Sequence, residues 1–115
     1  MTDIVDQAVL DKLSGEVGPE NIPMIIEMFC TDALARTEAI LQAMINRDAV
    51  VLAAQCHAMK GGAQSVGAMA LADMLQAAEL TAKNGDADQS VAYLGGFKPL
   101  FDETIEALKA ATARY

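Results

Sequence analysis

Signals that end helices recur along this chain of 115 residues and divide it into segments of helical length. Glycine and proline end helices because glycine frees the backbone and proline lacks an N–H donor. Between the breaks, alanine, leucine, methionine and glutamate are plentiful, aromatic residues are few, and β-branched residues never alternate along a run. The sequence therefore predicts an all-α fold. The breaks fall at Gly18-Pro19, Gly67, residues 84–86 and residues 95–99.

Short connections join the predicted helices, which favours an antiparallel four-helix bundle with a short additional N-terminal helix covering one end. Asn21 and Asp48 are suited to cap the second and third helices, and Gly67 to end the third in a left-handed conformation. Pro99 predicts a kink or short break in the last helix, because its ring would clash with the carbonyl of Gly95. The predicted helices span residues 5–17, 22–46, 49–66, 68–83 and 87–113.

Apolar side chains spaced three to four residues apart mark the buried side of each helix. No second apolar stripe is left over for dimerisation, so the sequence predicts a monomer. In the fourth predicted helix the inward-facing residues are Leu71, Met74, Leu75, Ala78 and Ala82. In the second they are Ile25, Met28, Phe29, Leu34, Ile40, Leu41, Met44 and Ile45.

Residues 1–115 are expected to form a single domain, because the chain is too short for a second core. Eight basic against sixteen acidic residues give a net charge of −8, which argues against nucleic acid or an anionic membrane surface as a partner. No apolar stretch reaches the roughly 18 residues of a membrane span. The acidic N-terminus lacks the basic flank and apolar core of a signal peptide, so we expect a cytoplasmic protein.

Cys30 and Cys56 are too few for a disulfide framework and lack CxxC spacing, so both are expected to be buried, reduced thiols. Cys56 precedes His57, but neighbouring helical residues point about 100° apart and cannot chelate one metal ion. Cysteines or carboxylates at ligand spacing are also missing, so we expect no metal and no cofactor on this chain. A nucleotide-binding glycine motif is missing too, which argues against a kinase.

The one histidine, His57, lies on the predicted helix 49–66. An imidazole is a good nucleophile when neutral, and it titrates near physiological pH. Met59, Ala63 and Val66 fall on the opposite side of the helix, so packing of that side turns the imidazole toward solvent. The residues that share the exposed face are His57, Lys60, Gly61 and Gln64.

Each neighbour on this face suits a histidine that carries a phosphoryl group. Lys60, one turn away, would offset the negative charge of the group, and Gln64 would offer hydrogen bonds to a partner. Gly61 removes side-chain bulk beneath the ring and lets another protein approach. Two adjacent glycines cost a helix roughly 1 kcal/mol each relative to alanine. The alternative explanation, close packing of a neighbouring helix, applies best to Gly62.

The spacing H-x-x-K-G from His57 to Gly61, with a further glycine at Gly67, resembles the signature of histidine-containing phosphotransfer (HPt) domains. The resemblance covers the whole chain and implies a helical bundle in which two long antiparallel helices carry the histidine. It implies that His57 takes a phosphoryl group from one receiver aspartate and passes it to another, assisted by Lys60 and Gly61. The implied partners are response-regulator receiver domains, which hold the Mg²⁺ and supply the catalysis, and a hybrid sensor histidine kinase. The chain would then be a phosphocarrier and not an enzyme.

In the family that this motif resembles, a polar residue on the following helix often holds the second ring nitrogen. With a turn at Gly67, residues ten to twelve positions later lie level with His57, which makes Glu79 the candidate to orient the ring. Gln76 lies closer to the turn. The alternative is that Glu79 is an ordinary exposed glutamate, paired with Lys83 at i, i+4.

A second function stays open at this point: a helical interaction module that binds a signalling partner without phosphoryl chemistry. Only the phosphocarrier needs the imidazole, so the substitution His57→Gln separates the two. Either function needs an apolar docking surface near the histidine. The candidates are Ala53, Ala54, Ala58 and exposed residues of the second helix.

Overall fold

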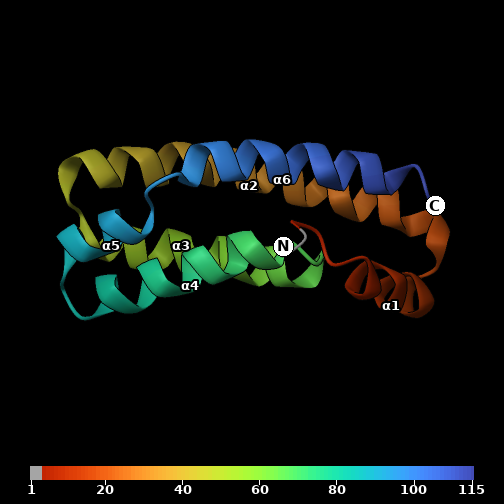
Figure 1. Cartoon of the computed structure of the whole chain (residues 1–115), viewed down its shortest axis with the longest axis horizontal. Coiled ribbons are helices and arrows are strands. Elements are labelled where there is room, and N and C mark those ends of the chain that lie inside the picture. Colours follow the sequence, from red (N-terminus) through yellow and green to blue (C-terminus); the bar gives the residue numbers. More distant parts are fainter. Residues whose placement is uncertain (1–3) are drawn as a thin grey trace.

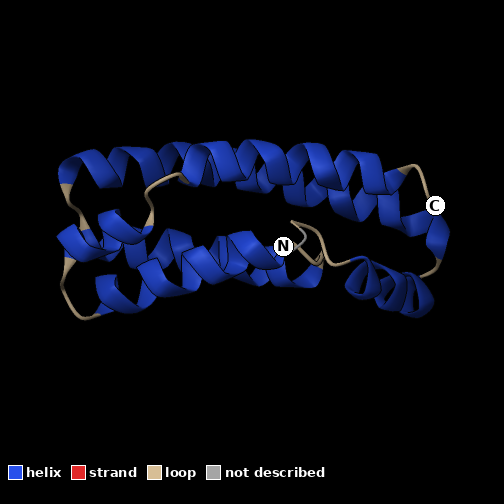
Figure 2. Cartoon of the chain, viewed as in Figure 1, coloured by secondary structure: helices blue, strands red, loops and turns tan. Residues whose placement is uncertain are grey.

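A computed structural model describes residues 4–115 of the chain. Every regular element in this part is helical, as Figure 2 shows, so the predicted all-α class is confirmed. None of the described helices is long and apolar enough to cross a membrane. The elements are α1 (Gln7–Val17), the short 3-10 helix η1 (Pro19–Asn21), α2 (Ile22–Asn46), α3 (Ala49–Ser65), α4 (Met69–Lys83), α5 (Ala87–Tyr93) and α6 (Phe97–Thr112).

Four long helices, α2, α3, α4 and α6, run along the length of the molecule and alternate in direction (Figure 1). Helix α3 packs between α2 and α4, and α6 closes the bundle against α2 and α4. Helix α1 lies at one end, and the short α5 lies at the other end against α4. The predicted four-helix bundle with an additional N-terminal helix is therefore confirmed.

The last predicted helix is divided in two, as the sequence suggested. Helix α5 ends at Tyr93, and Gly96 adopts a left-handed φ of 80° before α6 begins at Phe97. Pro99 consequently lies in the first turn of α6, where a missing N–H leaves no hydrogen bond unmade. The interruption is a full break between two helices.

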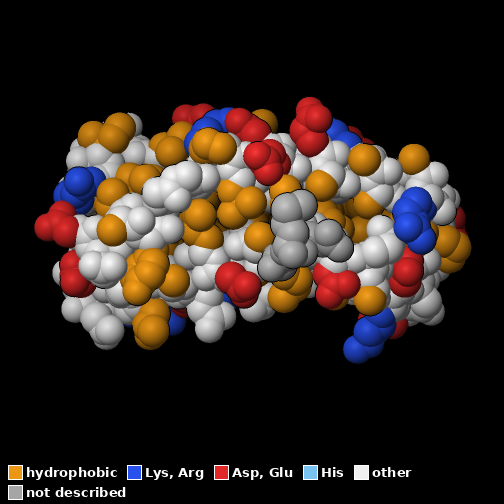
Figure 3. All heavy atoms as spheres, in the orientation of Figure 1, with side chains coloured by type: hydrophobic (Ala, Val, Ile, Leu, Met, Phe, Trp, Pro, Cys, Tyr) orange, Lys and Arg blue, Asp and Glu red, His pale blue; other side chains and the backbone are white. Residues whose placement is uncertain are grey.

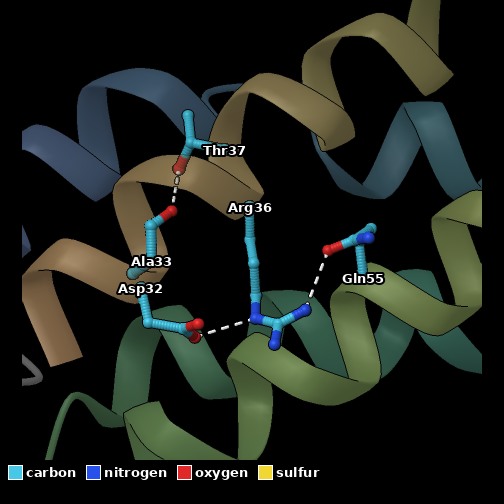
Figure 4. Close-up of polar contacts among 5 residues, drawn as sticks. All are labelled: Asp32, Ala33, Arg36, Thr37 and Gln55. Carbon is cyan, nitrogen blue, oxygen red and sulfur yellow. Dashed lines mark hydrogen bonds and ion pairs between the residues drawn. The ribbon is translucent and has the colours of Figure 1, made fainter. Parts of the chain in front are cut away.

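The bounds of α2 match the prediction, but its buried side was predicted only in part. Five of its eight predicted residues are buried or packed partly buried against the core. Met28, Leu34 and Ile45 are exposed, whereas small or polar residues take inward positions. Thr37 is one of these, and its hydroxyl donates to the carbonyl of Ala33 at 2.9 Å (Figure 4). Small side chains fit because α2 contacts α3 and α6 at the same time. The buried residues of α2 are Ile22, Ile26, Phe29, Ala33, Thr37, Ile40 and Ala43.

The caps of the helices follow the sequence with one exception. The carboxylate of Asp48 accepts from the backbone N–H of Val51 at 3.1 Å, which caps α3. Asn21 precedes α2, but its side chain makes no capping bond and donates instead to the carbonyl of Val17. Gly67 has a φ of 81°, as predicted for the turn between α3 and α4. A Cβ there would lie 2.7 Å from the carbonyl oxygen of Asp6, so the turn requires glycine.

Candidate functional site

Helix α3 has the two faces that its sequence predicts. Met59, Ala63 and Val66 pack into the core and are almost completely buried. On the other side, 66% of the His57 side chain is accessible to solvent. The imidazole is therefore held at the surface by the packing of the opposite face of its own helix.

Glu79 on α4 reaches the imidazole of His57. Its Oε2 atom lies 2.8 Å from Nδ1 of His57, within hydrogen-bond distance. Only 5% of the Glu79 side chain is exposed, so this carboxylate lies beneath the ring and away from water. The structure thus brings together the two residues that sequence reasoning had paired across the Gly67 turn.

Two lysines also bind this buried carboxylate. The ammonium group of Lys60 lies 2.6 Å from Oε1 of Glu79, and that of Lys83 lies 2.7 Å from Oε2. Oε1 has no hydrogen-bond donor of ideal geometry among the described residues, so the ion pair with Lys60 is what satisfies it. Lys60 therefore points inward to Glu79, whereas the sequence suggested a lysine free to face a phosphoryl group. Only 19% of its side chain is exposed.

Glu79 contacts His57 and also pairs with Lys83 at i, i+4. The alternative of an ordinary exposed glutamate is wrong, because the side chain is buried. Lys83 was not among the predicted site residues. The signal that finds it is its spacing of four residues from Glu79 on the same helix. A contact that looks like an ordinary surface pair in the sequence belongs to the site because Glu79 is buried.

The carboxylate of Glu79 is ionised across the physiological range. Burial alone raises the pKa of Glu79, but contacts from Lys60, Lys83 and His57, together with the charge of Lys60, outweigh it and lower this pKa to about 2. An ionised carboxylate can only accept hydrogen bonds, so Nδ1 of His57 carries the proton that it donates to Oε2. In the neutral ring this leaves Nε2 unprotonated, with its lone pair available as a nucleophile.

The two glycines of the motif have different surroundings. A Cβ added at Gly61 would meet nothing within 4 Å, so this part of the surface beside His57 is open. A Cβ added at Gly62 would lie 2.9 Å from Cδ1 of Phe29 on α2, so Gly62 permits close helix packing. Gln64 is exposed, and no hydrogen bond joins its side chain to the described residues of the site.

A polar contact ties α3 to α2 (Figure 4). Arg36 donates from Nε to Asp32 at 2.8 Å and from Nη1 to Oε1 of Gln55 at 3.1 Å. The bond to Asp32 stays within α2, and the bond to Gln55 crosses to α3 two residues before His57. Sequence reasoning missed this tie, because the partner of a long side chain depends on how the helices dock.

The rest of the described chain offers no second reactive centre. No group of three or more histidine, cysteine or acidic residues among residues 4–115 could hold a metal ion. Burial, and then the charge of Glu79, raise the pKa of Cys56 to about 12, so this thiol is inert. Cys30 is only half-buried, contrary to the prediction. It lines an open groove of about 880 Å³ between α2 and α6, to which His57 does not contribute.

The chain is similar to a known protein family, to named relatives and to a solved structure. The family model described as "Hpt domain" matches residues 24–111. The chain is 29% identical over 85 residues to the phosphorelay protein LuxU of Vibrio vulnificus, covering 74% of each chain. It is 27% identical over 82 residues to LuxU of Vibrio harveyi, covering 71% of this chain and 72% of that one. The crystal structure of histidine-containing phosphotransfer protein B from Pseudomonas aeruginosa superposes with a TM-score of 0.87 at 26% identity, over 100% of this chain and 99% of that one.

Proposed function

The chain belongs to the Hpt domain family, and from this membership we propose that His57 is the residue on which this histidine phosphotransfer protein of a phosphorelay carries the phosphoryl group. The observation that supports His57 is its contact with Glu79. An exposed imidazole has one nitrogen bound to a buried, ionised carboxylate and the other left free. This is the arrangement that a nucleophilic histidine needs.

The transfer step follows from this arrangement. The lone pair of His57 Nε2 attacks the phosphorus of an aspartyl phosphate on a receiver domain. A P–N bond forms while the P–O bond to the aspartate breaks, and the electron pair of that bond leaves with the aspartate carboxylate. The Nδ1 proton stays on the ring, which becomes positively charged. The carboxylate of Glu79, 2.8 Å away, offsets this charge, and the reverse steps return the group to a second receiver.

The partners that this function requires are receiver domains of response regulators and a hybrid sensor histidine kinase. We expect the receiver to supply the Mg²⁺ and the positioning of the phosphoryl group, so this chain is a carrier that needs no cofactor of its own. Docking needs an accessible apolar surface. Three exposed apolar side chains are available for this surface. Ala54 lies on α3 one turn before His57, Val50 lies one turn earlier on α3, and Leu80 follows Glu79 on α4. Gln64 extends the same face with a polar group.

The experiment is phosphoryl transfer from phosphorylated receiver domains, with Mg²⁺, to the wild type and to His57→Gln. We expect an acid-labile, alkali-stable phosphate on the wild type and none on the variant. A variant that is still folded but unlabelled identifies His57 as the carrier. If no receiver labels the folded wild type, the chain instead acts as the interaction module without phosphoryl chemistry.

The oligomeric state of the carrier stays a prediction. The sequence predicts a monomer on the argument that no apolar stripe is left over for dimerisation. Helix α2, however, exposes Met24, Met28 and Leu34, so that argument no longer holds. Sedimentation equilibrium of the purified chain at several concentrations decides between a monomer and a dimer.

A further inference from the structure

Lys83 shares one oxygen atom of Glu79 with the phosphoacceptor histidine. Its ammonium group lies 2.7 Å from Oε2, and Nδ1 of His57 lies 2.8 Å from the same atom. Lys60 occupies the other oxygen at 2.6 Å. The carboxylate is therefore fixed at both ends, and Lys83 fixes the end that accepts the imidazole proton.

A second pair in the chain shows what an ordinary contact of this spacing looks like. Lys98 and Asp102 on α6 are also four residues apart, with an N···O distance of 2.6 Å. The side chain of Asp102 is 57% exposed, so water competes for it and the pair contributes little. Glu79 is only 5% exposed, so losing one of its partners is not compensated by water.

The charges in contact around Glu79 do not cancel. Two ammonium groups, those of Lys60 and Lys83, face one carboxylate, which leaves an excess of one positive charge beside a neutral His57. The whole chain carries a net charge of −8, so this local excess is opposite in sign to the rest of the molecule. A phosphoryl group brings about two negative charges to the ring, and the local excess favours its arrival.

We propose that Lys83 is a positioning residue for phosphoryl transfer, which holds Glu79 Oε2 in place beneath His57 and supplies the positive charge that Lys60 alone does not. This rests on the proposed function of His57. Without Lys83, Oε2 loses one of its two partners and the carboxylate turns toward Lys60. Nδ1 then loses its acceptor, and the ring proton spreads to Nε2, the nitrogen that must attack. The nucleophilicity of Nε2 and the positive charge beside the ring both decrease.

The test uses full-length protein and phosphoramidate, a small phosphoryl donor that releases ammonia and needs no receiver. The variants are Lys83→Met, Lys83→Arg and, as a matched control from the exposed pair, Lys98→Met. ¹⁵N spectra of the His57 ring at alkaline pH report which nitrogen carries the proton, and ³¹P spectra report the rate of phosphorylation. A structural pair alone would change thermal stability but neither spectrum.

We expect Lys83→Met to lower the rate roughly tenfold, the size of effect seen when the partner behind a metal-binding histidine is removed. Its ring spectrum should show both tautomers. Lys83→Arg should restore most of the rate, and Lys98→Met should match the wild type. Lys83 is 58% exposed, so we expect the Met variant to fold, and Lys83→Gln provides the same test in a polar form.

A folded Lys83→Met or Lys83→Gln variant with the rate and the ring spectrum of the wild type overturns the inference and leaves the proposed function intact. A wild type that takes no phosphate at His57, from phosphoramidate or from receivers, overturns the proposed function. In that case the ring spectrum alone still decides whether Lys83 holds the tautomer.

Discussion

Nδ1 of His57 and Oε2 of Glu79 lie 2.8 Å apart, although the two residues are 22 positions apart in the sequence and on different helices. The contact exists because the Gly67 turn brings α4 back alongside α3. It ties an exposed imidazole to a buried carboxylate. Most of the behaviour that we expect from the site follows from this pair.

Removing Glu79 should slow phosphorylation of His57, and the loss should be larger for a substitute that keeps fewer of its contacts. The amide oxygen of Glu79→Gln still accepts from Nδ1 but lacks the charge, whereas Glu79→Ala also leaves Lys60 without its partner. We expect losses of about tenfold for Gln and up to about a hundredfold for Ala. Transfer from phosphoramidate measures this, with the exposed Glu38→Ala on α2 as the control. Equal rates for the wild type and Glu79→Ala would contradict the orienting role.

The acid limb of the stability curve should depend on Glu79. Its pKa is lowered from 4.5 to about 2 in the folded protein, so its contribution is fully present above about pH 4.5 and is lost as the pH falls toward 2. The contribution is on the order of 3 kcal/mol, because each pKa unit corresponds to about 1.4 kcal/mol. Urea unfolding of the wild type and Glu79→Gln at pH 7 and pH 3 measures it. The difference in the free energy of unfolding should shrink at pH 3, and a constant difference would refute the shift.

The two glycines of the motif should respond in opposite ways to alanine. Gly61→Ala meets no neighbour and should raise the free energy of unfolding by about 0.5–1 kcal/mol through helix propensity. Gly62→Ala presses on Phe29 and should lower it, because overpacking costs about 1–3 kcal/mol. Thermal unfolding measures both.

Transfer rates separate the roles of these glycines further. Gly61→Ala should slow transfer from a receiver domain, which must approach closely, and leave transfer from phosphoramidate unchanged. If each donor phosphorylates Gly61→Ala as fast as it phosphorylates the wild type, the bare surface beside His57 has no part in docking.

The C-terminal Tyr115 should hold α1 in place. Its hydroxyl donates to Asp11 at 2.6 Å and accepts from Gln7 at 2.6 Å, which joins residues more than a hundred positions apart. Tyr115→Phe removes both bonds at a cost of about 1 kcal/mol. Hydrogen exchange should show faster opening of α1 with little change in α3, and the phosphorylation rate should stay the same. A matching increase in exchange across α3 would mean that α1 and the bundle open as one unit.

The helix bounds were predictable because breaks in the chain are local chemistry. Asp48 caps α3 and Gly67 ends it through interactions with their own neighbours, which the sequence displays directly. The outward direction of His57 was predictable for a related reason. The apolar face of its helix must pack against the core, and His57 lies on the opposite face. Both inferences need no knowledge of which helices meet.

The buried side of α2 and the direction of Lys60 depend on how helices dock, and the sequence does not display that. Thr37 lies inward because α2 packs against both α3 and α6. A prediction from the spacing of apolar residues does not count a threonine as buried. Lys60 has a long, flexible side chain that finds Glu79 only once α4 is in position. Lys83 was predicted only as a surface partner of Glu79, because the sequence does not show that Glu79 is buried. The burial of Glu79 makes this pair part of the site.

If His57 carries the phosphoryl group as proposed, the exposure of its ring limits how long this protein can retain the group. Two thirds of the side chain is open to solvent, so water as well as a partner protein can reach a phosphorylated ring. We therefore expect the P–N bond to be hydrolysed at a rate close to that of a free phosphohistidine, because the fold does not enclose the ring. Such a carrier would not store a signal. The phosphoryl group would be passed on only where transfer to receivers is faster than hydrolysis of the phosphohistidine. We therefore expect the concentration of receivers, and not the stability of the carrier, to set how long the phosphorylated state is useful.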